Sequence, residues 1–174
     1  MKTLLLLRHA EPALTSPTGR DFDRPLTDEG HAAALLVGQL LRQRQLNPDI
    51  ILCSTAIRAH QTADGVIAGA RYHGALHFYE RIYEASTETL IELIAEVVEE
   101  NAAMILIIGH NPGLQDLLSR LTGDYRTPML PATLARIDLD IAGWSKLHAA
   151  ATTTAAAEAG RLVFALPPEA ARAH

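Results

Sequence analysis

The chain has 174 residues, of which 48% are apolar and 20% are charged, and its formal net charge at pH 7 is −5. This length suits a single domain with its own hydrophobic core, and the composition is that of an ordinary soluble globular protein. The negative net charge argues against non-specific nucleic-acid binding, which needs a basic face on the protein.

The amino-terminal segment contains a short apolar run, Leu4–Leu7. It is too short for a secretion signal, and Arg8 and His9 stand where a small-residue cleavage site would begin. No apolar stretch reaches the ~18 residues of a membrane span. A single cysteine, Cys53, excludes an internal disulfide framework and is typical of a reducing compartment. We therefore expect a cytoplasmic protein without membrane association, in which Leu4–Leu7 is a buried strand.

Strand and helix patterns alternate through the first half of the chain. A Gly-, Pro- and Asp-rich loop from Pro12 to Pro25 follows the first strand. A helix is predicted from Thr27 to about Gln45, because Thr27 can cap it, acidic residues follow the cap, and leucines recur on one face. The next predicted elements are a buried strand, Asp49–Cys53, and a second helix, Thr55–Ala68.

The alternation continues beyond residue 75. The stretch Ala75–Tyr83 is a weaker strand or a loop, and Ser86 begins a third helix whose apolar residues share one face. A third buried strand is predicted over Ala103–Ile108. Asn111 as the cap and Pro112 as the first helical residue then begin a fourth helix.

Strand signals return towards the carboxyl end. Leu134–Leu139 and Arg161–Leu166 are predicted sheet strands, and Trp144–His148 is a candidate partner strand between them. The Ala- and Thr-rich tract Ala149–Ala159 is a loop or a frayed helix, and the sequence does not decide between the two. The order of elements predicts an α/β fold, a three-layer sandwich with a mostly parallel central sheet, in one domain over residues 1–174.

Side chains suited to phosphate follow three of the predicted strands. Arg8 and His9 end the first strand, Arg58 lies just beyond the second, and the third leads to His110. The carboxyl ends of parallel strands meet at one edge of a sheet, where ligands of open α/β folds bind. Guanidinium groups pair well with phosphoryl oxygens, and of two imidazoles one can attack phosphorus while the other donates to its oxygens. Taken singly, each residue also fits an ordinary structural role, so both interpretations stay open at this point.

Four stretches carry short motifs, namely Leu7–Glu11, Arg24–Gly30, Ser54–Ala63 and Ile108–Gly113. The first has an Arg-His pair, the third has an Arg before an Ala-x-Gln-Thr-Ala run, and the last has the second histidine. In this order they resemble the histidine phosphatase superfamily, which includes cofactor-dependent phosphoglycerate mutases. The short chain and the segment Leu130–Thr133 most resemble the small branch that contains bacterial phosphohistidine phosphatases. The resemblance implies a phosphoglycerate mutase-like fold.

The resemblance also implies roles for the residues at the strand ends. His9 would be the nucleophile and would be transiently phosphorylated. Arg8, Arg58 and His110 would hold the phosphoryl oxygens, and no cofactor or metal is expected because these groups supply the positive charge. The expected activity is hydrolysis of a phosphomonoester or phosphoramidate, carried by a phosphorylated small molecule or a phosphoprotein.

A carboxylic acid would protonate the leaving group in such an enzyme. We choose Glu84, since the stretch Arg81–Glu84 resembles the family stretch that carries this acid, with Glu80 and Glu11 as competitors. The family's glycine after the nucleophile is Ala10 in this chain. Alanine does not readily take positive φ, so we expect negative φ at Ala10.

Three other interpretations compete with this one. A cysteine phosphatase could use Cys53 with Arg58, but four residues separate them where such a loop needs five, and no glycine lies between. A metal hydrolase could use His73 and His77, although no acidic residue nearby completes a ligand set. A non-catalytic phosphate-binding or interaction module would retain the fold and the pocket without turnover.

The predicted substrate class follows from the span between Glu84 and Ala103, which holds one amphipathic helix. The larger family members place additional helices there, and these cover the pocket. An open pocket would discriminate poorly among small phosphomonoesters and would admit phosphohistidine or another phosphorylated protein side chain. Alternatively, the loop from Pro12 to Pro25, with Arg20 and Arg24, covers the site as a lid, and the enzyme then prefers one metabolite.

Overall fold

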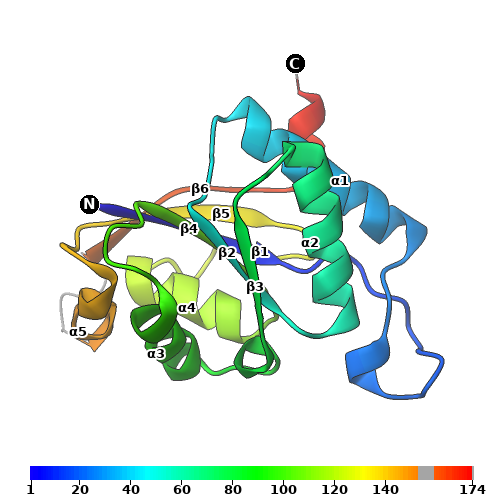
Figure 1. Ribbon diagram of the computed structural model, residues 1–174, viewed down its shortest axis with the longest axis horizontal. Coiled ribbons are helices and arrows are strands. Elements are labelled where there is room, and N and C mark those ends of the chain that lie inside the picture. Colours follow the sequence, from blue (N-terminus) through cyan, green and yellow to red (C-terminus); the bar gives the residue numbers. More distant parts are fainter. Residues whose placement is uncertain (153–158, 174) are drawn as a thin grey trace.

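The computed structural model describes residues 1–152 and 159–173. Within these residues the strands are β1 (Lys2–Arg8), β2 (Ile50–Ser54), β3 (Ala75–Tyr79), β4 (Met104–Gly109), β5 (Leu134–Leu139) and β6 (Gly160–Leu166). They form one six-stranded sheet with the order β3-β2-β4-β1-β5-β6 (Figure 1). β1 to β4 are mutually parallel, whereas β5 is antiparallel to both of its neighbours, β1 and β6. The prediction of a mostly parallel sheet is confirmed.

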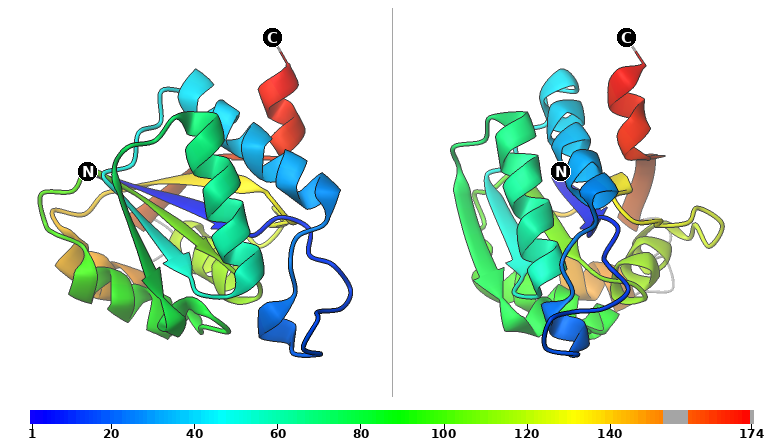
Figure 2. Two further views of the ribbon diagram at one scale, coloured as in Figure 1. Left: turned by 45° about the vertical axis from the view of Figure 1, so that its right-hand side comes forward. Right: turned by 90° about the vertical axis from the view of Figure 1, so that its right-hand side faces the viewer.

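Helices cover both faces of the sheet. They are α1 (Asp28–Gln43), α2 (Ile57–Ala70), α3 (Thr87–Val97), α4 (Gly113–Thr122) and α5 (Leu147–Thr152), with 3-10 turns η1 (Asp21–Asp23), η2 (Glu80–Ile82), η3 (Trp144–Lys146) and η4 (Pro168–Arg172). α1 and α2 lie on one face, and α3, α4 and α5 lie on the other (Figures 1 and 2). The predicted three-layer sandwich is confirmed. None of the described helices is long and apolar enough to cross a membrane.

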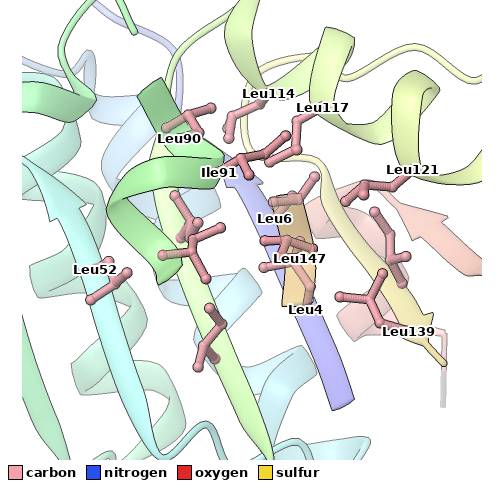
Figure 3. Close-up of a cluster of buried hydrophobic side chains, with 14 of the residues drawn as sticks. Leu4, Leu6, Leu52, Leu90, Ile91, Leu114, Leu117, Leu121, Leu139 and Leu147 are labelled. Carbon is pink, nitrogen blue, oxygen red and sulfur yellow. The ribbon is translucent and has the colours of Figure 1, made fainter. Parts of the chain in front are cut away.

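The apolar run of β1 is buried on both faces of the sheet. Leu4 and Leu6 pack against the α3 and α4 side, as Figure 3 shows, and Leu5 and Leu7 pack against the α1 and α2 side. All four side chains are fully buried. Burying such a side chain contributes about 1.5–3 kcal/mol, so β1 is anchored from both layers and its carboxyl end is held in place.

Most predicted helix starts match the structure. The Thr27 and Ser86 hydroxyls accept hydrogen bonds from backbone N–H groups three residues ahead, so both act as the predicted caps of α1 and α3. The prediction for α4 was wrong by one residue, because Pro112 occupies the cap position and the helix begins at Gly113. The side chain of Asn111 instead donates to the carbonyl of Met129.

The segment around Trp144 was predicted wrongly. Trp144–His148 forms η3 and the start of α5, and β5 pairs directly with β6. The Trp144 side chain is fully buried and its indole N–H donates to the carbonyl of Ala102, so its apolar ring fills the core without joining the sheet. Ala75–Tyr83 divides into β3 and η2, and the first residues of the tract Ala149–Ala159 continue α5, whereas residues 153–158 lie outside the described residues.

α1 and α2 touch through their backbones. A Cβ built on Gly38 would lie 2.3 Å from the carbonyl oxygen of Val66, and one built on Gly69 would lie 2.2 Å from that of Leu35. Side chains larger than hydrogen do not fit at these two positions without displacement of a helix. This close contact fixes α2, whose first turn carries Arg58.

Candidate active site

The structure brings together predicted site residues from three strand ends. β1 and β4 are neighbours in register, with Arg8 opposite Gly109, so the residues that follow, His9 and His110, lie side by side. Their ring centroids are 5.1 Å apart. Arg58, near the start of α2, donates from Nε to Nε2 of His9 over 3.3 Å. The carboxyl edge of the sheet therefore holds the expected imidazoles and guanidiniums in one group.

The contacts of His9 define which ring nitrogen carries its proton. Nδ1 lies 2.7 Å from the carbonyl oxygen of Ala10, and because a carbonyl can only accept, Nδ1 holds the proton. Nε2 therefore presents its lone pair to the Nε–H of Arg58. Burial lowers the pKa of His9 to about 4, and the nearby guanidiniums of Arg58 and Arg8 lower it as well. His9 is thus neutral at pH 7, and Nε2 is its unprotonated ring nitrogen.

His110 is also buried and neutral. Burial, followed by the proximity of His9 and Arg58, lowers the pKa of His110 to about 3. Its Nε2 lies 2.8 Å from the hydroxyl of Ser54, which itself accepts from the N–H of Ala56. Ser54 therefore has its hydroxyl proton available for Nε2, an arrangement that leaves the proton of His110 on Nδ1. That Nδ1 is buried and has no hydrogen-bond partner within the described residues.

The two arginines place positive charge beside the two imidazoles. Burial lowers the pKa of Arg8, and so does the charge of Arg58. Arg8 donates from Nη1 to the carbonyl of Met129, while its buried Nε has no partner. Arg58 is 7% exposed, and its guanidinium carbon lies 5.8 Å from the ring centroid of Tyr83. Two cations beside two neutral imidazoles form a site suited to an anion.

The loop between β1 and α1 supplies one carboxylate to this group. Asp21 accepts from Nη2 of Arg58 over 3.0 Å, from the hydroxyl of Tyr83 over 2.8 Å and from Nη1 of Arg24 over 2.9 Å. Nη1 of Arg58 also donates to the carbonyl of Asp21. The bonds from Tyr83 and Arg24 are the main causes that lower the pKa of Asp21 to about 2. The loop contacts the site through Asp21 and Arg24, whereas Arg20 pairs with Asp23 on the surface.

Sequence analysis did not identify Asp21 or Tyr83 as site residues. Asp21 lies in a loop without periodicity, and Tyr83 lies in a short segment with mixed strand and loop signals. Both approach Arg58 only because the chain folds back from distant positions. No pattern in the chain marks either residue.

A cavity of about 810 Å³ adjoins this group, with Arg58 and His110 among its lining residues. Glu84 also lines the cavity. Of the two competing acids, Glu11 lines a different cavity, and Glu80 is exposed in η2 and lines neither. The structure therefore brings Glu84, and not its competitors, to the cavity that contains the arginine and the second histidine.

The structure also shows the surroundings of the residues behind two competing interpretations, a cysteine phosphatase and a metal hydrolase. Cys53 is fully buried among apolar side chains, and burial raises the pKa of its thiol. His73 and His77 are exposed. The described residues contain no group of three or more His, Cys, Asp or Glu side chains that could hold a metal ion. Ala10 is not among the described residues with positive φ, as predicted, and its N–H donates to the hydroxyl of Thr62.

A family model described as histidine phosphatase superfamily, branch 1, matches residues 4–103. The chain belongs to this superfamily. It is similar to an uncharacterized protein of Mycobacterium tuberculosis, with 42% identity over 109 residues that cover 61% of this chain and 63% of that protein. The match thus spans less than two thirds of the length of this curated relative.

Two solved structures with a similar fold have been assigned as phosphohistidine phosphatase SixA. The structure from Agrobacterium tumefaciens is 28% identical with a TM-score of 0.77, and the similarity covers 96% of this chain and 98% of that one. The structure from Nakamurella multipartitia is 26% identical with a TM-score of 0.75, covering 95% of this chain and 96% of that one. These similarities confirm the phosphoglycerate mutase-like fold and the likeness to the SixA branch.

The lowered pKa of His9 predicts a pH-dependent stability. The unfolded chain binds a proton at His9 below about pH 6.5, whereas the folded protein binds it only near pH 4. Between these values the unfolded state holds more protons, so the free energy of unfolding falls as pH falls. We expect His9→Gln to reduce this dependence while the part that comes from His110 remains, measured by urea unfolding from pH 7 to pH 4. An NMR titration of His9 with its midpoint near pH 6.5 contradicts the prediction, and His31→Gln, at an exposed histidine outside the site, is the control.

The contacts of Asp21 predict that it competes with anions for Arg58. Half-exposed ion pairs contribute about 0.2–1 kcal/mol, so removing this carboxylate should strengthen binding of inorganic phosphate by about 1.4- to 5-fold. We expect this gain in Asp21→Asn by calorimetric titration, with Asp23→Asn as a matched control, since Asp23 pairs with Arg20 in the same loop. Weaker phosphate binding in Asp21→Asn would show that the carboxylate mainly holds Arg58 in position.

Proposed function

We propose that the protein is a phosphohydrolase in which Nε2 of His9 accepts a phosphoryl group and transfers it to water. The observation that carries this proposal is the state of His9, which is buried, neutral and protonated at Nδ1 through the Ala10 carbonyl. An imidazole in this state is a competent nucleophile at neutral pH, and it lies beside a guanidinium that can hold phosphoryl oxygens. The family and the SixA structures support a phosphatase of this kind.

The reaction proceeds in two displacements at phosphorus. Nε2 of His9 forms a bond to phosphorus while the bond to the leaving group breaks, and Glu84 gives the leaving group its proton. Water then attacks the phosphorylated His9, Glu84 takes the proton of that water, and inorganic phosphate leaves. Arg8, Arg58 and the Nδ1–H of His110 stabilise the charge on the phosphoryl oxygens in both steps, which is the role that a metal ion fills in other phosphatases.

The proposed substrate is a phosphohistidine or another phosphorylated side chain of a protein, with small phosphomonoesters as weaker substrates. Between Glu84 and β4 the chain forms only α3, so no extra helical layer covers the cavity from that segment. Few groups then contact a small substrate beyond its phosphate, and small substrates are discriminated poorly. The two SixA structures, by the names they carry, point to the same substrate class.

The covalent intermediate is the direct test of this function. Rapid acid-free quenching with ³²P-labelled substrate should trap label on His9, and the phosphoramidate should be labile in acid and comparatively stable in base. His9→Ala should abolish the label, His31→Ala should not, and Arg58→Lys should lose on the order of 10²-fold in rate. Label that survives acid indicates a serine or threonine ester and contradicts the mechanism. Phosphate binding without any label favours the non-catalytic module instead.

The proposed role of Glu84 as proton donor is tested by varying the leaving group of the substrate. A poor leaving group such as an alkoxide needs a proton in the transition state, whereas nitrophenolate barely needs one. Glu84→Gln should therefore slow hydrolysis of alkyl phosphates far more than that of nitrophenyl phosphate. Glu80→Gln is the matched control, because Glu80 is exposed and does not line the cavity. An equal loss on both substrates in Glu84→Gln would assign the proton donor to another residue.

A further inference from the structure

The two histidines of the candidate site are alike in charge and differ in their contacts. Both are buried and neutral at pH 7, and their ring centroids are 5.1 Å apart. His9 donates from Nδ1 to the carbonyl oxygen of Ala10, whereas His110 contacts the hydroxyl of Ser54 through its other ring nitrogen, Nε2. The chemical role of His110 therefore depends on what the Ser54 hydroxyl does.

The sheet places Ser54 beside His110. Ser54 is the last residue of β2, which pairs with β4 with Cys53 opposite Ile108. Because β4 lies between β1 and β2, the residue that follows it, His110, has His9 on the β1 side and Ser54 on the β2 side. Ser54 is fully buried, so its hydroxyl is out of reach of bulk water.

A backbone contact fixes the hydroxyl oxygen of Ser54. The N–H of Ala56 donates to this oxygen over 3.2 Å, in the turn that leads from β2 into α2. The oxygen thus has a fixed position, 2.8 Å from Nε2 of His110. Only the direction of the hydroxyl proton remains to be assigned.

The contacts of Ser54 show where that proton points. A hydroxyl has one proton to donate, and within the described residues Nε2 of His110 is the one acceptor that the Ser54 side chain contacts. If Nε2 carried the histidine proton instead, the hydroxyl proton would be buried without an acceptor, and a buried unpaired donor is strongly disfavoured. Ser54 therefore donates to Nε2, and His110 carries its proton on Nδ1.

This contact separates the roles of the two imidazoles. The Ser54 hydroxyl has no alternative acceptor in the part of the chain that the structure describes, so the lone pair of His110 stays occupied. Nε2 of His9 also accepts a hydrogen bond, from Nε of Arg58 over a longer 3.3 Å. A guanidinium has further N–H groups and pairs well with phosphoryl oxygens, so Arg58 can free this lone pair when a phosphoryl group binds.

We propose that Ser54 is a positioning residue that holds His110 in the tautomer with its proton on Nδ1, so that His110 is a hydrogen-bond donor and His9 alone is the nucleophile. This proposal rests on the proposed phosphohydrolase function and adds to it a residue that does not line the cavity. The opposite tautomer would present a lone pair in place of the N–H that stabilises the phosphoryl oxygens, and it would repel them.

The tautomer of His110 can be measured directly by NMR. Long-range ¹H–¹⁵N correlation spectra of the ¹⁵N-labelled protein at pH 7 should show a protonated Nδ1 and an unprotonated Nε2 for His110, as for His9. In Ser54→Ala no donor holds the lone pair of Nε2, so we expect His110 to shift towards the tautomer with its proton on Nε2, while His9 keeps its own. A native His110 that is protonated on Nε2 overturns the proposal, as does a tautomer that Ser54→Ala leaves unchanged.

The rate should follow the hydroxyl. Ser54→Ala should lower kcat/KM about 2- to 10-fold, which is the scale of one neutral hydrogen bond. His110→Ala should lose more, on the order of 10²-fold, because it removes the donor itself. Ser54→Thr keeps the hydroxyl and should recover both the native tautomer and the native rate. If the added methyl group prevents folding, the tautomer and rate of Ser54→Ala decide alone, and a native rate with a shifted tautomer overturns the proposal.

A control separates this effect from the loss of a contact at a helix start. Ser54→Ala also removes the hydrogen bond from the N–H of Ala56. Thr27→Val removes an equivalent bond, from the N–H of Gly30 at the start of α1, and Thr27 contacts neither histidine. It should lower the free energy of unfolding without changing the tautomer of His110 or the rate. An equal shift of the tautomer in Thr27→Val overturns the specific role of Ser54.

Failure of this proposal and failure of the proposed function give different results. The tautomer is measured in the resting protein and needs no turnover. Label on His9, together with a His110 tautomer that Ser54→Ala leaves unchanged, removes the role of Ser54 and keeps the phosphohydrolase. If no substrate labels His9, calorimetric titration with inorganic phosphate replaces the rate. Weaker binding in Ser54→Ala with a shifted tautomer then supports the role of Ser54 without catalysis, and equal binding overturns it.

Discussion

Arg58 donates from all three of its guanidinium nitrogens, to Nε2 of His9, to the backbone of Asp21 and to the carboxylate of Asp21. The rest of the site depends on this one side chain. It donates to the lone pair of His9, it ties the loop between β1 and α1 to the sheet edge, and it helps to keep both imidazoles neutral. Its own position depends on the close contact between α1 and α2, where glycines at 38 and 69 let the two backbones meet.

Much of the fold and the inner part of the site could be predicted, because both follow from local signals. Leu4–Leu7 is a continuous apolar run because its strand is buried by helices on both sides, and such a run is visible in sequence. Once the strands are placed, parallel pairing brings Arg8, His9 and His110 to one edge without further information. Thr27 and Ser86 cap their helices through contacts within three residues, which is the range over which sequence patterns are informative.

The remaining features depend on contacts between distant segments. Asp21 reaches Arg58 across 37 positions and Tyr83 across 62, and nothing near Asp21 in the sequence distinguishes it from the other acids of its loop. Trp144 was assigned to a strand because a bulky apolar residue fits one, yet its indole N–H finds its acceptor, Ala102, 42 positions away. The sequence predicts Asn111 as a cap, whereas its amide donates to the carbonyl of Met129 on a separate loop. In each case a polar group was satisfied by a partner that no local pattern identifies.

Asp21 sets the cost of binding an anion at Arg58. Its carboxylate accepts from Nη2 of Arg58 over 3.0 Å, so an anion that approaches this nitrogen meets a carboxylate that is already bound to it. The hydroxyl of Tyr83 and Nη1 of Arg24 also donate to Asp21, which gives the carboxylate two partners besides Arg58. An anion can therefore take the place of Asp21 at Nη2 while the carboxylate keeps two of its hydrogen bonds and Nε of Arg58 keeps its contact with His9. Because an exposed ion pair contributes only about 0.2–1 kcal/mol, this exchange costs little, and the same carboxylate can return to Arg58 when the anion leaves.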